Sequence, residues 1–443
     1  MNSADSATST RLSEAAINPL TTLDPAASLD DLSWLDAAIG DARVVAIGES
    51  AHYNREFYLL RHRLLRYLVE RHGFGAYAVE SGFIEGRHTD GWIHGDGDSE
   101  RLSEVMADGI TSLMGLWTPV RAHLDWMRRH NSTATSPIRW YGIDMPGSNV
   151  SLLPGLDAVT AYLETAEPGF QLDPGIRELA GNLAAPSAFS QQQTFTGYVQ
   201  LDGERRDALT AGLADIAARM TSRRLDYLRH TTVDDYERSL RALLVTVALD
   251  AMYRRLARGD QRGMMMTREA GIAGTVEWIL QREDRVVLVA HNAHVQRSPG
   301  SLPGMDAAIT MGMNVADRLG GQYLAIGTTT GSGRTLNTGA DFFAGQLFTD
   351  LQTPQPGSLD ALMTASHDAP FATDLRRLSS ADAELVRATT EHRMGNVYCE
   401  AAPLDAFDIV VHIPHVTAAE PDEAAVARSP ADVRAAFGNW SGR

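Results

Sequence analysis

Six short, almost uninterrupted apolar segments constrain this chain more than any other feature of its sequence. Each is four to seven residues long and ends beside a polar or glycine-rich stretch. Strands without polar alternation are typical of a parallel sheet covered on both faces. We therefore predict an α/β fold with a mostly parallel central sheet and helices on both faces. The predicted strands are 43–48, 76–79, 138–143, 285–290, 323–327 and 407–413.

A helix is predicted between the first two strands, over Tyr53–His72. Apolar side chains recur there at helical spacing, with arginines on the opposite side, and Gly73 has the character of a C-cap. The unit is therefore predicted to be strand, helix, strand, with a right-handed crossover that joins a parallel pair of strands.

Four regions are predicted along the 443 residues. Residues 1–28 are small and polar and are expected to form a flexible N-terminal arm. Residues 29–150 form the first α/β half, which carries the catalytic motif. Residues 151–258 lack strand signals and are predicted to be a helical insertion that covers the active-site cleft. Residues 259–443 form the second α/β half, in which 332–370 is expected to be a long loop region.

The charge and the basic residues exclude several kinds of function. The formal net charge is −17, which argues against a nucleic-acid surface. The sequence contains no lysine, so all 39 basic residues are arginines. This excludes a lysine Schiff base and a lysine-dependent phosphate loop.

The chain is expected to be cytoplasmic. Its single cysteine, Cys399, cannot form an intramolecular disulfide, which fits a reducing compartment. The first twenty residues do not have the pattern of a secretory signal, and no stretch is apolar enough to span a membrane. A small-molecule partner is expected, and the sequence does not predict an oligomeric state.

Ionisable residues gather where the predicted strands end. In open α/β sheets, ligands bind outside the carboxyl ends of the strands. Ionisable side chains at several strand ends would not stabilise the fold, so their presence together indicates one shared site. The residues are Glu49, His52, Glu80, Asp144, His291 and His294.

His52 is predicted to be a catalytic base. It precedes the helix that begins near Tyr53, and the positive end of a helix disfavours the imidazolium form. A neutral imidazole is what a general base needs. Glu49, three residues earlier, is placed to orient the ring. A purely local hydrogen bond would explain His52 alone, and it is the whole set that favours a catalytic role.

The segment AHNAHVQR places His291 and His294 at an H-x-x-H spacing. Two histidines with carboxylates could bind a metal ion, but no H-E-x-x-H or similar signature accompanies them. We therefore predict a site without metal or cofactor. His291 follows its strand directly and is the stronger catalytic candidate, while His294 and Asp144 are predicted to contact substrate.

Arginines are the only permanent cations available. Arg61 lies in the first helix and Arg268 follows the run GMMMT, and either could hold an oxyanion or a substrate oxygen. A G-x-S-x-G elbow and a G-x-G-x-x-G loop are both absent from the strand ends. Water is therefore the expected nucleophile.

The segment VVAIGESAHYNREFYLLRHRLLRYLVERHGFGAYAVESGFIEG resembles the opening signature of the erythromycin esterase family. YGIDMP and VVLVAHNAHVQR resemble further family blocks in the same order. The resemblance implies cofactor-free hydrolysis of a macrolide lactone ester by water that a histidine activates. It implies that His52 is this base, that Glu80, His291 and Glu49 are site residues, and that Arg61 and, less closely, Arg268 match the family.

The leading hypothesis is thus an esterase acting on a macrolide or a related ester. A second hypothesis keeps the site but changes the reaction to elimination, cyclisation or acyl transfer on a natural product. A third is a macrolide-binding protein without turnover, which the intact set of His52, Glu80 and His291 argues against.

Overall fold

A computed structural model describes residues 10–300 and 306–441. Its main feature is a nine-stranded sheet with the strand order β1-β8-β11-β6-β2-β5-β3-β4, in which β7 pairs with β6. A separate hairpin is formed by β9 and β10. The strands are β1 (Asn18–Pro19), β2 (Val44–Glu49), β3 (Ala76–Gly82), β4 (Arg139–Asp144), β5 (Val286–His291), β6 (Tyr323–Leu336), β7 (Phe348–Asp350), β8 (Phe371–Asp374), β9 (Glu391–Met394), β10 (Val397–Glu400) and β11 (Ile409–Val416).

The six central strands are parallel. They run in the order β11, β6, β2, β5, β3 and β4 and correspond to the six strands predicted from the sequence. Antiparallel pairings join β8 to β11, β1 to β8, and β7 to the end of β6. The predicted fold class, an α/β fold with a mostly parallel sheet, is confirmed.

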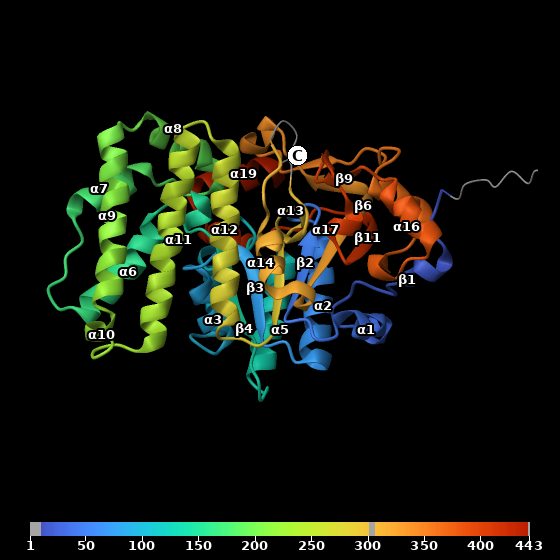
Figure 1. Cartoon of the computed structure of the whole chain (residues 1–443), viewed down its shortest axis with the longest axis horizontal. Helices are drawn as coiled ribbons and strands as arrows, with labels where there is room; N and C mark the ends of the chain where they lie inside the picture. Colours follow the sequence, from blue (N-terminus) through green and yellow to red (C-terminus); the bar gives the residue numbers. More distant parts are fainter. Residues whose placement is uncertain (1–9, 301–305, 442–443) are drawn as a thin grey trace, which may run out of the picture.

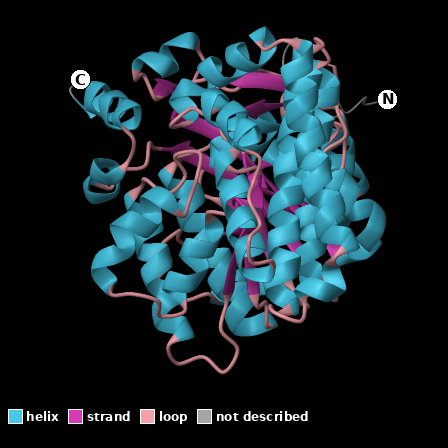
Figure 2. Ribbon diagram, turned by 90° about the vertical axis from the view of Figure 1, so that its left-hand side faces the viewer, coloured by secondary structure: helices cyan, strands magenta, loops and turns pink. Residues whose placement is uncertain are grey.

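Both faces of the sheet are covered by helices, as Figure 2 shows. Along β2, Val44 and Ala46 enter one hydrophobic cluster, while Val45 and Ile47 enter the other. All four side chains are at most 3% exposed. Burial on both faces explains why the strands lack polar alternation.

The helices pack on the two faces of the sheet. The face to which Val45 and Ile47 of β2 point carries α2 (Arg55–His72), α3 (Gly86–Ile93), α4 (Leu102–Asp108) and α5 (Thr118–Asn131). The remaining helices are α1 (Asp36–Ile39), α6 (Leu153–Ala166), α7 (Pro174–Leu183), α8 (Gln191–Gln200), α9 (Gly203–Ser222), α10 (Arg224–Tyr227), α11 (Val233–Ala257), α12 (Gln261–Leu280), α13 (Asn292–Val295), α14 (Met311–Leu319), α15 (Leu359–Ser366), α16 (Ser380–Arg387), α17 (Pro403–Ala406), α18 (Glu423–Arg428) and α19 (Ala431–Ser441).

Residues 153–280 are helical throughout apart from short connections, and α9, α11 and α12 stand side by side beside the sheet (Figure 1). The apolar faces of α6, α9, α11 and α12 belong to the cluster that covers the second face of the sheet. This agrees with the helical content predicted for 151–258, whereas the division into domains stays a prediction.

Three local predictions differ from the structure. Strands β2 and β3 are parallel but not neighbours, because β5 lies between them. The first long helix begins at Arg55 rather than Tyr53, since Tyr53 has a φ of 66° and cannot continue a right-handed helix. The expected loop over 332–370 contains the end of β6, β7 and α15.

The N-terminal arm is also different from its prediction. Residues 1–9 lie outside the described residues, but 10–28 pack against the body of the protein. Asn18 and Pro19 pair with β8, and Leu12 and Leu20 are each 3% exposed. Isolated leucines in a polar stretch carry no periodicity, so the sequence pattern did not show this burial.

Candidate active site

The carboxyl ends of four neighbouring strands bring the predicted site residues together. Glu49 ends β2 directly opposite His291, which ends β5. Asp144 ends β4 opposite Gly82 of β3. The pairing of β3 with β4 is irregular after Val79, and Glu80 lies in this irregularity. Such irregularities re-aim side chains at the rims of sheets.

His52 lines a cavity, and the carboxylate of Glu49 fixes the orientation of its ring. Nδ1 of His52 donates to Oε1 of Glu49 at 2.6 Å, and Nε2 lies 4.0 Å from Oε1 of Glu80. Burial lowers the pKa of His52, but Glu80 and Glu49 outweigh it and raise the pKa above its usual value. The expectation that the helix end would disfavour the imidazolium is therefore not met: the charges of Glu80 and Glu49 raise the pKa, and the helix begins only at Arg55.

Glu80 is the centre of the site. Its Oε1 contacts Nε2 of His294 at 3.0 Å and Nη2 of Arg268 at 3.2 Å, and its Oε2 accepts the backbone N–H of His291 at 2.7 Å. Burial raises the pKa of Glu80, but His294, His52 and Arg268 outweigh it and hold the pKa well below its usual range. Glu80 is therefore an ionised carboxylate.

His291 is held as a neutral imidazole. Its Nε2 donates to the carbonyl of Ser50 at 3.2 Å, and its Nδ1 accepts the backbone N–H of Ala293 at 3.2 Å. Burial and the nearby His52 lower its pKa to about 3. The rings of His52 and His291 are 5.2 Å apart, so the two histidines face the same small space.

The turn after β5 lies directly over β2. A Cβ atom at Gly48 would stand 2.2 Å from Oδ1 of Asn292, so only glycine permits this close approach. Asn292 in turn exchanges two hydrogen bonds with the backbone of Thr328 on β6. This clamp fixes the start of α13 and, with it, His291 and His294.

His294 lies between two carboxylates, of which Glu269 was not predicted. Nδ1 of His294 is 2.6 Å from Oε1 of Glu269, and both residues are buried. A signal for Glu269 exists, because Glu269, Ile272 and Ala273 share one face of α12 at helical spacing. A glutamate on an apolar helix face is unusual and marks a buried partner.

Arg268 and Asp144 form a two-point ion pair beside Glu80. Nε and Nη2 of Arg268 lie 3.1 and 2.6 Å from the two oxygens of Asp144. Burial lowers the pKa of Arg268, but Asp144 outweighs it and raises the pKa above its usual value. Asp144 therefore contacts Arg268 rather than the cavity, and Arg268 lies at the edge of the cavity.

Arg61 lies behind the site. It contacts Oε2 of Glu49 at 3.2 Å and stacks on the ring of Tyr58 at 3.9 Å. It is not among the residues that line the cavity in front of His52. The geometry thus connects Arg61 to the acid that orients His52.

Two loops with unusual backbone geometry lie next to His52. Five non-glycine residues in the described chain have φ between 55° and 66°, and all belong to this region: Tyr53, Ser112, Leu113, Ser148 and Asn149. Tyr53 donates to the carbonyl of Ser112, and Ser112 donates its N–H to Ser148. Strained backbone of this kind is concentrated at functional sites.

The cavity in front of His52 has a volume of about 380 Å³. Beyond the ionisable residues, its walls are largely apolar and come from distant parts of the chain, namely Met265, Ile309, Leu336, Met394 and Val397. Ala188 and Gln191 line it from the helical region. We name residues 187–191 the roof segment.

Contacts on both sides hold the roof segment in place. Phe189 stacks on Phe342 with ring centroids 5.1 Å apart. Ser187 and Ser190 both donate to Asp432 at the start of α19. The roof segment therefore joins the helical region to the C-terminal part of the chain.

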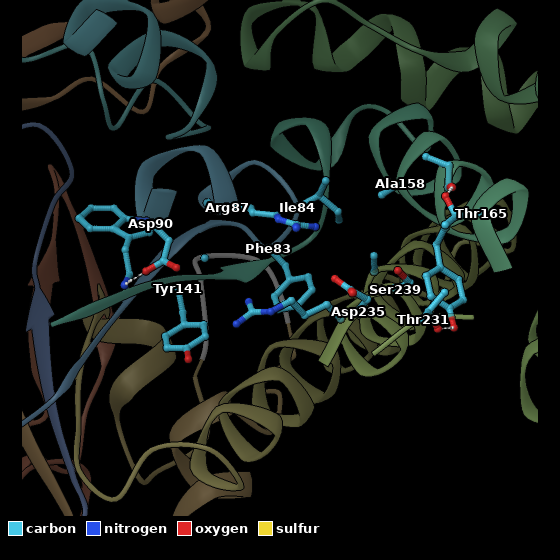
Figure 3. Close-up of a pocket in the computed structure, with 17 residues that line it drawn as sticks. Phe83, Ile84, Arg87, Asp90, Tyr141, Ala158, Thr165, Thr231, Asp235 and Ser239 are labelled. Atoms are coloured by element: carbon cyan, nitrogen blue, oxygen red, sulfur yellow. Dashed lines mark hydrogen bonds between the residues drawn. The ribbon is translucent and has the colours of Figure 1, made fainter. Parts of the chain in front are cut away.

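A second cavity, of about 410 Å³, lies between α3 and β4 on one side and α6 and α11 on the other (Figure 3). Its walls include Phe83, Ala158 and Asp235, and Asp90 accepts the N–H of Trp140 at its edge. None of the predicted site residues lines it. The ionisable cluster, and not the size of a cavity, distinguishes the candidate active site.

In the described residues, no group of three or more histidine, cysteine, aspartate or glutamate side chains is arranged to hold a metal ion. Over residues 10–300 and 306–441, no helix combines the length and apolarity required to cross a membrane.

The fold and the site define an α/β protein of the enzyme class in which histidines and carboxylates gather at the carboxyl ends of parallel strands. Residues 69–416, which include Glu80 and His291, match the sequence model of the family described as erythromycin esterase. The chain belongs to the erythromycin esterase family, as its resemblance in sequence implied.

Individual relatives agree with this assignment. The chain is 29% identical to erythromycin esterase type II of Escherichia coli over 405 residues, which cover 88% of this chain and 93% of that protein. It is 26% identical to erythromycin esterase type I of Escherichia coli over 307 residues, which cover 68% and 73%.

Solved structures share the fold. A Bacillus cereus protein matches with a TM-score of 0.75 and 20% identity, covering 91% of this chain and 96% of that one. An erythromycin esterase, EreC, crystallised as a histidine-to-asparagine mutant in its open conformation, matches with a TM-score of 0.72 and 20% identity, covering 91% and 98%.

Proposed function

We propose that this protein hydrolyses the lactone ester of a macrolide or of a related bulky substrate, with His52 as the general base. The geometry of His52 carries the proposal. Its Nδ1 is held by Glu49, and its Nε2 faces the cavity, where it can take a proton from water. The names of the two curated relatives support the choice of an ester as substrate.

Glu49 and Glu80 support the base in different ways. Glu49 fixes the tautomer of His52 through its hydrogen bond to Nδ1. Glu80, 4.0 Å from Nε2, stabilises the imidazolium that forms when His52 takes the proton. Because its pKa is held well below the usual range, Glu80 is a weak base that acts by its charge and does not compete with His52 for the proton of water.

Arg268 is the group that we assign to the carbonyl oxygen of the substrate. Nε and Nη2 of Arg268 contact Asp144 and Glu80, so the guanidinium is fixed where it lines the cavity, and Nη1 is the nitrogen that we assign to the substrate carbonyl. His291 is neutral near pH 7, but its single N–H already donates to the carbonyl of Ser50 and its Nδ1 accepts from Ala293. In this arrangement it fixes the strand end beside His52 and does not donate to the substrate. His294 and Asp144 act on Glu80 and Arg268 rather than on the substrate.

The region 151–258 acts as a cap over this site. Ala188 and Gln191 of the roof segment line the cavity opposite the strand ends. The apolar walls suit a substrate with a large apolar body, which a macrolide ring provides. Closing such a cap excludes bulk water and strengthens the electrostatic contacts inside.

Incubation with a panel of macrolides tests the function. Hydrolysis adds the mass of one water to the substrate, whereas cyclisation or elimination does not. The expected result is a hydrated, ring-opened product from the wild-type protein and none from His52→Ala. A protein that raises its melting temperature with a macrolide but leaves every panel member unchanged would be a binder, and the proposal would be wrong.

A further inference from the structure

We propose that Glu269 is a positioning residue that holds His294 as an imidazolium and, through it, fixes Glu80 beside His52. This rests on the proposed function and adds a residue outside the set that the sequence predicted. It also reassigns His294 from a substrate contact to a link between two carboxylates.

Glu269 is rigidly held on α12. It is 3% exposed, and its two oxygens contact different partners. Oε1 is 2.6 Å from Nδ1 of His294, and Oε2 accepts the backbone N–H of Met311 at 2.6 Å. Met311 begins α14, so the carboxylate is fixed between a side chain and a helix start.

His294 meets a carboxylate at each ring nitrogen. Nδ1 faces Glu269, and Nε2 is 3.0 Å from Oε1 of Glu80. A neutral imidazole has one N–H, so one of its nitrogens would direct a lone pair at a carboxylate. A ring protonated at both nitrogens avoids this repulsion on either side, so the two short contacts favour the imidazolium.

The charges around His294 agree with this assignment. Burial lowers the pKa of His294, but Glu269 and then Glu80 outweigh it and raise the pKa to about 10. The charged and titratable groups that face the ring come from α12, β3, β5 and the turn after β2, and they are Glu269, Glu80, Arg268, His291 and His52. Arg268 opposes protonation, and the two carboxylates in contact outweigh it.

The positive charge on His294 has two effects on the base. It holds Glu80 ionised, with Oε1 3.0 Å from His294 and 4.0 Å from His52. It also lowers the pKa of His52, which limits the increase caused by Glu80 and Glu49. A neutral His294 would leave His52 protonated to higher pH, and the fraction of active base would fall.

Glu269→Gln tests this role with little change in shape. The amide oxygen can still accept from Met311, while the amide N–H₂ faces Nδ1 and favours a neutral ring. We expect kcat to fall about tenfold or more with KM changed less than about twofold, because Glu269 lines the cavity but both of its oxygens are engaged by His294 and Met311 and not open to the substrate. The acid limb of the pH profile, which reports His52, should move to higher pH. The basic limb, which reports loss of the proton from His294, should move to lower pH, and each shift should be about 1–3 units.

Glu277→Gln on the same helix is the matched control. Glu277 pairs with Arg318 near the surface, and this variant should keep the wild-type pH profile. A Glu269→Gln enzyme with an unchanged pH profile would overturn the inference, even if its kcat were lower, since a merely structural role lowers kcat without moving the limbs.

A titration of the ring nitrogens of His294 by NMR in the wild-type protein gives a second, activity-independent measurement. We expect the imidazolium to persist up to about pH 9 without any substrate. A ring that titrates near 6.5 overturns the inference. Turnover by His52→Ala would overturn the proposed function. It would not affect the NMR measurement, which tests the Glu269–His294 pair without any reaction.

Discussion

Glu49 and His291 are direct partners in the register of two neighbouring parallel strands, β2 and β5. The acid that orients His52 and the second histidine of the site are therefore placed by the sheet itself. This register brings the rings of His52 and His291 to within 5.2 Å of each other. Sites built on strands hold their geometry more closely than sites built on loops.

Replacing His52 by alanine should abolish most of the activity. General base catalysis contributes ~10²–10⁴-fold, so we expect kcat to fall by at least that order. The measurement is the steady-state rate of macrolide hydrolysis. His72→Ala at the far end of α2 is a suitable control, because His72 pairs with Asp36 outside the site. Near-normal turnover by His52→Ala would refute the assignment of the base.

The pH dependence of activity should show the raised pKa of His52. The base is active only when neutral, so kcat/KM should rise with pH through a midpoint above 6.5. In Glu49→Gln the hydrogen bond persists but the charge is lost, and the midpoint should move down by about 1–3 units. An acid limb that stays in place in this variant would show that Glu49 does not act on His52.

Loss of Arg268 should destabilise the fold as well as the activity. Arg268→Ala leaves Asp144 and Glu80 buried without their cation, and breaking a buried pair costs about 3–5 kcal/mol. Chemical denaturation measures the change in the free energy of unfolding. The comparison variant is Arg255→Ala, which removes an exposed pair with Asp260 and should cost at most about 1 kcal/mol. Equal losses in the two variants would contradict the buried pair described above.

The packed N-terminal segment predicts a stability effect far from the site. Leu20 is 3% exposed, and its replacement by alanine should cost about 2–5 kcal/mol. Leu225, which is 74% exposed, is the matched control, and its replacement should change stability by no more than about 0.5 kcal/mol. Thermal melting of both variants would decide whether residues 10–28 are a structural part of the domain or a loose arm.

The stability of the protein at high pH should depend on His294. Its pKa is raised in the folded state to about 10, so the folded protein binds this proton more tightly than the unfolded chain. The stabilisation is complete below about 6.5 and is lost as the pH rises toward 10. Denaturation of wild type and Glu269→Gln between pH 6 and 10 should show a smaller loss in the variant.

The sequence was sufficient to predict the central strands and the residues at their ends. Uninterrupted apolar runs have few alternatives to a covered parallel sheet, and the polar residues after them must meet at one edge. The order of the strands was beyond this reasoning. Strand β5 lies between β2 and β3 although more than 200 residues separate it from β3, and local patterns carry no information on such pairings.

The charge states of the site also needed the structure. The position of His52 before a helix is visible in the sequence, whereas its closeness to Glu49 and Glu80, which raise its pKa, is not. The sequence predicts Arg61 and Asp144 as substrate contacts, whereas their side chains contact Glu49 and Arg268. Glu269 lies in the middle of a helix, away from any strand end, and a search of the strand ends could not find it.

The roof segment has a consequence for the kinetics of the enzyme. Its stacking of Phe189 on Phe342 and its hydrogen bonds to Asp432 tie the helical layer to the far side of the cavity without a covalent link. A substrate too large for the mouth of the cavity would reach the strand ends only once these contacts separate, and its product would leave by the same movement. The rates of association and of product release would then depend on residues that do not contact the reacting atoms, and substitutions there would change turnover without changing the chemistry.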